Sequence, residues 1–180
     1  SLEFISKKND ASMFVLGNHT KKRPNNLIIG RMFDHQLLDM LELQVVNYKG
    51  LAQFVATKCH VGSKPLFIFQ GEQFHLNGTG SDSYSKLANL VVDLFKGEQI
   101  DSIDLQGLEY VIAVSALSDG TEGTVQFKVY SIKMEKSATK LPRIELDEMG
   151  PSMELKMLRS RFSTDEMKKA SLKRPKELVS

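Results

Sequence analysis

The chain has 180 residues, a formal net charge of +2 and a single cysteine, Cys59. A chain of this length forms one domain or two small ones and buries roughly 70% of its unfolded surface without covalent staples. A lone cysteine excludes an internal disulfide framework and a multi-thiolate zinc site, and no apolar run approaches the roughly 18 residues of a membrane span, so we expect a soluble protein of a reducing compartment.

A basic connector, residues 17–26 (GNHTKKRPNN), lies between two predicted β-strands over 12–16 and 27–33. It has no acidic residue, and its basic residues are His19, Lys21, Lys22 and Arg23. A hairpin loop needs only about two to five residues to reverse the chain, so this loop is longer than the fold requires. Its length and charge favour contact with a polyanion, most obviously nucleic acid, although an ordinary solubilising loop can also hold three cations.

Two core helices are predicted next. The first spans 35–43, and Asp34 is its N-terminal cap. Its core-facing residues are Leu37, Leu38, Met40 and Leu41. The second spans 83–96, where apolar residues recur at i, i+3, i+4 and i+7. Ser81 or Asp82 caps its start, and Gly97 ends it.

The remaining chain contains strand signals over 66–69, 110–114, 125–132 and 153–158. A turn at Asp119 and Gly120 makes 110–132 a hairpin. A capping box at 163–166 starts a helix at Thr164 that must stop before Pro175. Because strands and helices interleave, the predicted class is α/β or α+β with a mixed sheet.

The charge is unevenly distributed along the chain. Residues 1–60 have eight cations and five anions, 61–150 have eight and thirteen, and 151–180 have eight and four. Basic ends around an acidic middle are expected if both ends meet one polyanion. A seam near Gly62 divides one domain, 1–180, into halves of about 1–62 and 63–180.

No catalytic constellation is visible in the sequence. The four histidines are scattered without the spacing of a zinc motif: His19, His35, His60 and His75. Cys59 and His60 are sequence neighbours, and neighbouring side chains diverge in most backbones. We therefore predict a protein that is not an enzyme and uses neither a metal nor another cofactor.

Three stretches carry a more specific signal: GNHTKKRPNNLIIGRMFDHQLLDMLEL at 17–43, GSKPLFIFQGEQF at 62–74, and IELDEMGPSMELKMLRSRF at 144–162. Together they resemble the Brix domain family over nearly the whole chain. The last stretch is similar to the family's GPR-containing strand, with Ser152 in place of the Arg. Relatives extend further at both ends, so we expect this chain to be the core of a longer protein.

This resemblance implies a Brix-like fold of two similar halves, each a mixed sheet with helices, resembling anticodon-binding domains. It implies a non-enzymatic assembly factor of the large (60S) ribosomal subunit that binds rRNA in the nucleolus and nucleus. The most similar members form a heterodimer with the regulator of ribosome synthesis protein. The pair brings 5S rRNA and its ribosomal proteins into pre-ribosomes.

The predicted RNA contacts are the basic connector and a second cluster near the end of the chain. They comprise His19, Lys21, Lys22, Arg23, Asn25, Asn26, Arg31, Arg159, Arg161, Lys168 and Lys169. The cations would hold phosphates, and the asparagines would donate amide hydrogen bonds. With only Phe14 and Phe33 near the connector as stacking platforms, we expect recognition of shape and phosphate instead of bases.

For the protein partner, the sequence offers the strand over 125–132 as a free edge. Its predicted contact residues are Phe127, Val129, Tyr130 and Ile132. The same alternation also suits a strand buried in the core. Two other functions stay open: a general RNA-binding adaptor with an anticodon-binding-like fold, and an anticodon-binding module of a synthetase.

Overall fold

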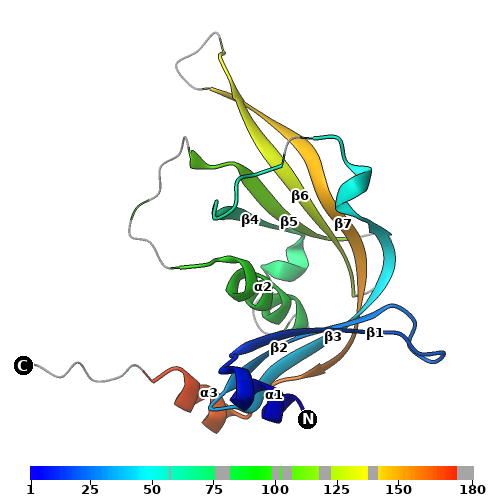
Figure 1. Cartoon of the computed structure of the whole chain (residues 1–180), viewed down its shortest axis with the longest axis vertical. Helices are drawn as coiled ribbons and strands as arrows, with labels where there is room; N and C mark the ends of the chain where they lie inside the picture. The colour runs from blue at the N-terminus through cyan, green and yellow to red at the C-terminus, as the bar shows by residue number, and fades with distance from the viewer. Residues whose placement is uncertain are drawn as a thin grey trace, which may run out of the picture.

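The structure is a computed structural model that describes residues 1–56, 58–75, 82–98, 102, 107–117, 123–137 and 142–173. Within these residues, seven strands form one curved sheet in the order β1-β2-β3-β7-β6-β5-β4 (Figure 1). β4 and β5 pair in parallel, and the other neighbours are antiparallel. The predicted mixed α/β class is confirmed.

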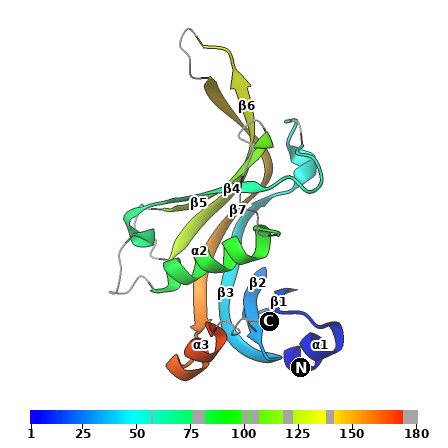
Figure 2. The ribbon, with the colours of Figure 1, turned by 90° about the vertical axis from the view of Figure 1, so that its left-hand side faces the viewer.

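The strands are β1 (Met13–Asn18), β2 (Asn26–Phe33), β3 (Gln36–Lys49), β4 (Pro65–Gln70), β5 (Tyr110–Ala116), β6 (Thr124–Glu135) and β7 (Arg143–Arg161). The α-helices are α1 (Leu2–Asn9), α2 (Asp82–Phe95) and α3 (Asp165–Ser171), and the 3₁₀ turns are η1 (Leu51–Gln53) and η2 (Glu72–Phe74). α1 and α3 both lie at the end of the molecule opposite the β6–β7 end, and α2 crosses one face of the sheet (Figure 2).

The predicted helix over 35–43 is wrong, because these residues belong to β3. β3 pairs with β2, and Phe33 lies opposite Gln36, so Asp34 and His35 form a two-residue hairpin loop. Both loop residues have positive φ, 48° and 56°, as a type I′ turn requires. The leucines that suggested a helix belong to a strand with buried residues on both faces. The sequence of such a strand does not alternate between apolar and polar residues.

β6 is an internal strand, which corrects the predicted free edge. It pairs with β5 on one side and β7 on the other, and the free edges of the sheet are β1 and β4. Phe127 and Val129 are only 5% and 6% exposed and belong to the core, so they are not accessible to a protein partner. Tyr130 and Ile132 alternate with them and are part-buried on the opposite face.

The predicted β5–β6 hairpin is confirmed by its antiparallel register, whereas its predicted turn at 119–120 lies outside the described residues.

The predicted helix over 83–96 is confirmed as α2. Leu87, Leu90 and Val91 are buried against the sheet, and the rings of Phe95 and Phe127 lie 6.1 Å apart. Fully burying one such aliphatic side chain contributes about 1.5 to 3 kcal/mol. Gly97 ends the helix with φ 61°, a conformation that glycine adopts without strain. The predicted caps, Ser81 and the side chain of Asp82, lie outside the described residues.

β7 connects the two parts of the sheet because it pairs with β3 along one edge and β6 along the other. One continuous sheet therefore crosses the seam predicted near Gly62, and the division into two similar halves stays a prediction. The strand changes register against both neighbours. At Gly150, with φ 73°, a Cβ would lie 2.2 Å from Cδ2 of Phe54, so only glycine lets the segment after η1 pack there.

A charged cluster under α2 ties four elements together. Asp39 on β3 is 2% exposed and accepts hydrogen bonds from the Arg31 guanidinium at 2.5 Å and from the backbone N–H of Ser163 at 3.1 Å. Lys86 on α2 lies 3.5 Å from the same carboxylate, and Arg31 also pairs with Asp93 on α2 at 2.6 Å. Burial alone would raise the pKa of Asp39, but these hydrogen bonds and charges outweigh it and lower the pKa.

The chain then turns into α3. Thr164 caps this helix by accepting a hydrogen bond from the N–H of Met167 at 3.4 Å. The predicted helix is confirmed, but it begins at Asp165, one residue later than predicted, with Thr164 and not Ser163 as its cap. The helix ends at Ser171, before Pro175.

Glu109 fixes the segment that precedes β4. Its carboxylate accepts hydrogen bonds of 2.7 Å from the backbone N–H of His60, the His60 ring and the Ser63 hydroxyl. These three donors lower the pKa of Glu109 to about 2.

Replacing Asp39 should destabilise the protein strongly. Asp39→Asn leaves Arg31 and Lys86 beside an uncharged amide, so we expect the free energy of unfolding to fall by about 3 kcal/mol in urea denaturation. Asp147→Asn is the matched control, because Asp147 forms an exposed pair with Lys133 and exposed pairs contribute about 0 to 1 kcal/mol. Equal effects of the two substitutions would contradict the importance of the buried cluster.

The contribution of Glu109 should depend on pH. Its folded pKa of about 2 lies below the ordinary value of 4.5, so the ionised form stabilises the fold above pH 4.5, and this stabilisation is lost as the pH falls toward 2. The stability difference between the wild type and Glu109→Gln should therefore be largest at neutral pH and shrink over that window. Denaturant titrations from pH 7 to pH 3 measure it, and a constant difference would refute the assignment.

Candidate nucleic-acid interface

The β1–β2 hairpin confirms the predicted basic connector and shortens it to residues 19–25. Inside this loop, the backbone N–H of Thr20 donates to the carbonyl of Arg23 at 3.0 Å, and the N–H of Arg23 donates back at 3.1 Å. The Thr20 hydroxyl also accepts from Arg23 N–H at 3.0 Å. These bonds close a tight turn that displays Lys21 and Lys22 at its tip, both exposed.

The base of the loop is held by Asn25. Its φ is 49°, a left-handed conformation that asparagine tolerates better than most residues. Its N–H donates to Nδ1 of His19 at 3.2 Å, and its carbonyl accepts from Val45 N–H on β3 at 2.8 Å. The same ring nitrogen lies 3.1 Å from Oδ1 of Asn25, so His19 and Asn25 are joined at two points.

Two predicted contacts at the loop are engaged inside the protein. Arg23 forms an ion pair with the buried Glu42 at 2.8 Å, while 38% of its side chain stays exposed. Asn26 is 3% exposed, and its amide donates to the same Glu42 oxygen at 2.9 Å. Asn26 is therefore a structural residue, and the prediction that it donates to RNA is wrong. Arg23 supports the loop and retains only part of its donor surface.

Arg31, a predicted RNA contact, is also engaged inside the protein. Its guanidinium is held between Asp39 and Asp93 in the cluster under α2, so its charge is already neutralised. Sequence alone does not reveal this pairing, since Asp93 is 62 positions away along the chain.

The C-terminal cations do not join the hairpin tip in one cluster. Arg161 lies opposite Met40, whereas the hairpin base lies opposite Gln44, about 13 Å further along β3. Lys168 and Lys169 are on α3, and Figure 1 shows the β1–β2 loop projecting away from that helix. The predicted residues Arg159, Arg161, Lys168 and Lys169 are all exposed and form no ion pair with any described residue.

Lys156 is a cation that the sequence analysis missed. It lies opposite Gln44, which in turn lies opposite Asn26, so it is on β7 beside the base of the hairpin. It is exposed. Only the register across three strands could have identified it.

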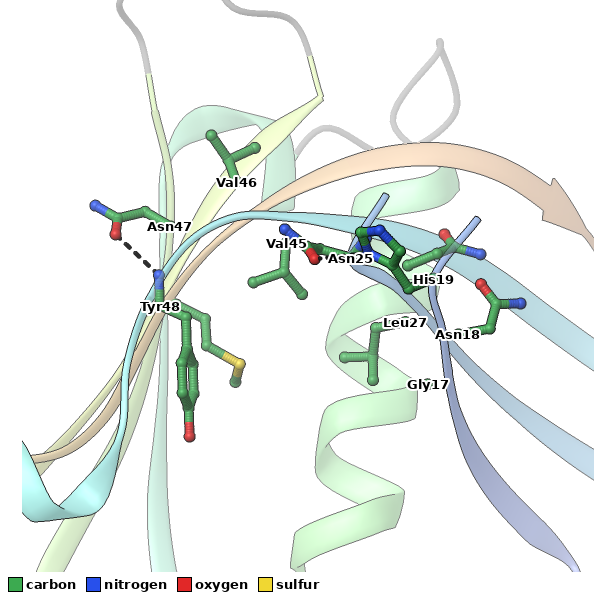
Figure 3. Close-up of a pocket in the computed structure, with 11 residues that line it drawn as sticks. Gly17, Asn18, His19, Asn25, Leu27, Val45, Val46, Asn47 and Tyr48 are labelled. Atoms are coloured by element: carbon green, nitrogen blue, oxygen red, sulfur yellow. Dashed lines mark hydrogen bonds between the residues drawn. The ribbon is translucent and has the colours of Figure 1, made fainter. Parts of the chain in front are cut away.

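A groove of about 660 Å³ opens beside the hairpin, within the range of small-molecule sites (Figure 3). It is lined by Gly17, Asn18, His19, Asn25, Asn26, Leu27, Val45, Val46, Asn47, Tyr48 and Met153. The sequence analysis did not identify Tyr48, which is 59% exposed, because the predicted helix ended before it.

The two predicted stacking platforms lie elsewhere. Phe14 is opposite Gly30 and packs over it, and Phe33 is at the far end of β2.

Among the described residues, no group of three or more His, Cys, Asp or Glu side chains is placed to hold a metal ion. His19, His35 and His60 hydrogen-bond to different partners, Asn25, Ser6 and Glu109. The helices within the described part of the chain are all too short or too polar to span a bilayer. The arrangement can bind an anion at the hairpin and a flat or apolar group in the groove.

Comparison with known proteins identifies relatives over the whole chain. The family model described as Brix domain matches residues 1–159. A human protein named Ribosome production factor 2 homolog is 44% identical over 178 residues, which cover 99% of this chain and 56% of that protein. The protein of the same name from Schizosaccharomyces pombe is 42% identical over 181 residues, covering 98% of this chain and 56% of its own length.

The chain therefore spans about half the length of these curated relatives. The crystal structure of a probable ribosomal biogenesis protein from Aeropyrum pernix K1 aligns with a TM-score of 0.47 and 9% identity, over 91% of this chain and 77% of that one.

Proposed function

Because the chain belongs to the Brix domain family, as its sequence motifs indicated, we propose that it is a non-enzymatic assembly factor of the large ribosomal subunit that holds rRNA. The names of the relatives support a role in ribosome production. The observation that carries the RNA contact is the pair of exposed lysines, Lys21 and Lys22, at the tip of a hydrogen-bonded turn.

Lys21 and Lys22 have no ion-pair partner among the described residues, so their charges are available to phosphates. Glu42 is close to the loop, but it is buried and already pairs with Arg23 and Asn26. The proposed contact set is therefore His19, Lys21, Lys22 and Asn25, with Lys156 beside the hairpin base. The predicted contacts at Arg159, Arg161, Lys168 and Lys169 are exposed but lie apart from the hairpin, and they stay predictions.

The proposal includes a protein partner, the regulator of ribosome synthesis, with which the chain would recruit 5S rRNA and its ribosomal proteins in the nucleolus. What supports a partner is an apolar sheet face, which we name the open face. It consists of Leu66, Ile68, Tyr130, Ile132, Met134, Ile144 and Leu146. α2 lies on the opposite face, and α1 and α3 lie at the far end of the molecule (Figure 2).

The open face exposes large apolar side chains on neighbouring strands. Ile144 and Leu146 on β7 are 61% and 46% exposed, and Leu66 and Ile68 on β4 are each 38% exposed. These apolar side chains lie around the Lys128–Glu148 ion pair, and exposed apolar surface of this kind marks protein interaction sites in soluble proteins. Tyr130 and Ile132, predicted as partner contacts, belong to this face, which supports the proposal that the partner binds a sheet face and not a strand edge.

Charge reversal at the hairpin tests the RNA contact. The double variant Lys21→Glu, Lys22→Glu should bind 5S rRNA and pre-rRNA more weakly, and its log–log salt slope should be smaller in magnitude by about 1.5, since each neutralised phosphate contributes about 0.7 to 0.9. Fluorescence anisotropy over a potassium chloride series measures both quantities. The matched control, Lys7→Glu, Lys8→Glu on α1, reverses two exposed charges outside the predicted contacts and should bind like the wild type. Unchanged binding of the hairpin variant would refute the proposed contact.

A single charge on the open face tests the partner. Leu146→Glu should abolish co-purification with the regulator of ribosome synthesis protein, because docking would bury an unpaired carboxylate. Leu172→Glu, at the C-cap of α3, changes a residue that is 71% exposed outside the open face and should leave the complex intact. Co-expression followed by affinity purification and gel filtration measures the outcome, with unfolding midpoints to verify the fold. A complex retained by Leu146→Glu would place the partner elsewhere.

A further inference from the structure

The groove beside the hairpin has the composition of a nucleobase site. Its apolar wall is formed by Leu27, Val45 and Met153, and the exposed ring of Tyr48 stands at its side (Figure 3). Large aromatic side chains gain free energy from burial, so a ring left 59% exposed beside a groove is available to a ligand. Stacking of bases on aromatic rings is the principal means of holding single strands.

The polar lining of the groove also suits a base. Asn18, Asn25 and Asn47 contribute carboxamides. The oxygens of Asn25 and Asn47 already lie within hydrogen-bond distance of His19 Nδ1 and Tyr48 N–H, so these two residues offer their NH₂ groups. Carboxamides of this kind pair with base edges in RNA and DNA complexes. Asn47 accepts from the N–H of Tyr48 at 2.9 Å, and its side chain lies on the other side of β3 from the Tyr48 ring (Figure 3), so Asn18 and Asn25 are the amides left for a base on that ring.

Asn26 is among the groove residues but is engaged inside the protein. Its amide NH₂ donates to Glu42, but its Oδ1 is buried and accepts no hydrogen bond from any described residue. Buried carbonyl oxygens without a partner are uncommon in folded proteins. Because this oxygen is shielded from solvent, it is not available to a ligand in the groove.

The groove is continuous with the cationic tip. His19 and Asn25 line the groove and also form the base of the loop that displays Lys21 and Lys22. No acidic residue lines the groove. A ligand that unites a flat, hydrogen-bonding ring with a neighbouring phosphate matches both parts, whereas an apolar peptide would leave the amides without partners.

We propose that this groove binds one unpaired base of single-stranded RNA, stacked on Tyr48 and read by the surrounding amides, while the Lys21–Lys22 tip holds the adjoining phosphate. This inference rests on the proposed RNA-binding function and changes its character. The sequence predicted recognition of phosphate and shape alone. The groove adds a contact with a base that is not paired in a duplex.

Short RNAs test the proposal. An eight-nucleotide single strand with 2-aminopurine at one position should lose fluorescence on binding as the base stacks, and Tyr48→Ala should remove this change and weaken binding on the order of tenfold. Tyr48→Phe retains a ring and should behave like the wild type. A blunt duplex of the same length should bind the wild type and Tyr48→Ala equally, because its bases cannot enter the groove. Salt slopes of the wild type and Tyr48→Ala should agree.

The control that separates the two proposals is the variant Lys21→Glu, Lys22→Glu. If it weakens RNA binding while Tyr48→Ala does not, the groove proposal fails and the phosphate contact stands. If neither variant alters RNA binding, both proposals fail. Loss of duplex and single-strand binding to the same extent in Tyr48→Ala would also overturn the base site. Thermal unfolding midpoints equal to the wild type show that the variants are folded.

Discussion

The fold depends on the pairing of β7 with two strands that are distant in sequence. β3 belongs to the first third of the chain and β6 follows α2, yet β7 hydrogen-bonds to both and makes a single sheet of them. Without β7, β1–β3 would be a small meander and β4–β6 a separate three-stranded unit under α2, and small units of that size are marginal alone. The pairing also sets where the surface cations lie, since the positions of Lys156 and Arg161 follow from its register.

The protein divides its N-terminal cations into two groups by the anions that surround them. Arg31 lies between Asp39 and Asp93 under α2, and Arg23 reaches back to Glu42. A buried carboxylate is costly to desolvate unless donors and charges compensate it, so these arginines are required where they are. Lys21 and Lys22 do not neutralise a buried carboxylate among the described residues, so the fold does not require their charges. In the sequence these basic residues look like one patch. In the structure the arginines stabilise the fold, and the lysines are exposed.

Sequence reasoning found most elements, and its errors have physical causes. α2 was predictable because one of its faces is apolar and the other is not, and β5 and β6 because alternation marks a strand with one covered face. β3 was missed because Leu41, Glu42 and Leu43 are all buried, so alternation fails, and because the Asp34–His35 turn lacks the glycine that announces a type I′ loop. The site was only half predictable: the basic loop is local in sequence, whereas Tyr48 and Lys156 reach it through strand pairing.

The preorganised hairpin and the position of the open face would allow this chain to bind RNA and a protein partner at the same time. Backbone hydrogen bonds between Thr20 and Arg23 fix the tip in the free protein, so the proposed RNA contact would cost less conformational freedom than a flexible loop would. The open face belongs to β4–β7, while the hairpin belongs to β1–β2 at the opposite edge of the sheet (Figure 1). A protein seated on the open face would leave the hairpin and its groove accessible. Simultaneous binding of RNA and a protein therefore requires no rearrangement of the sheet, which suits a factor that joins components of a larger particle.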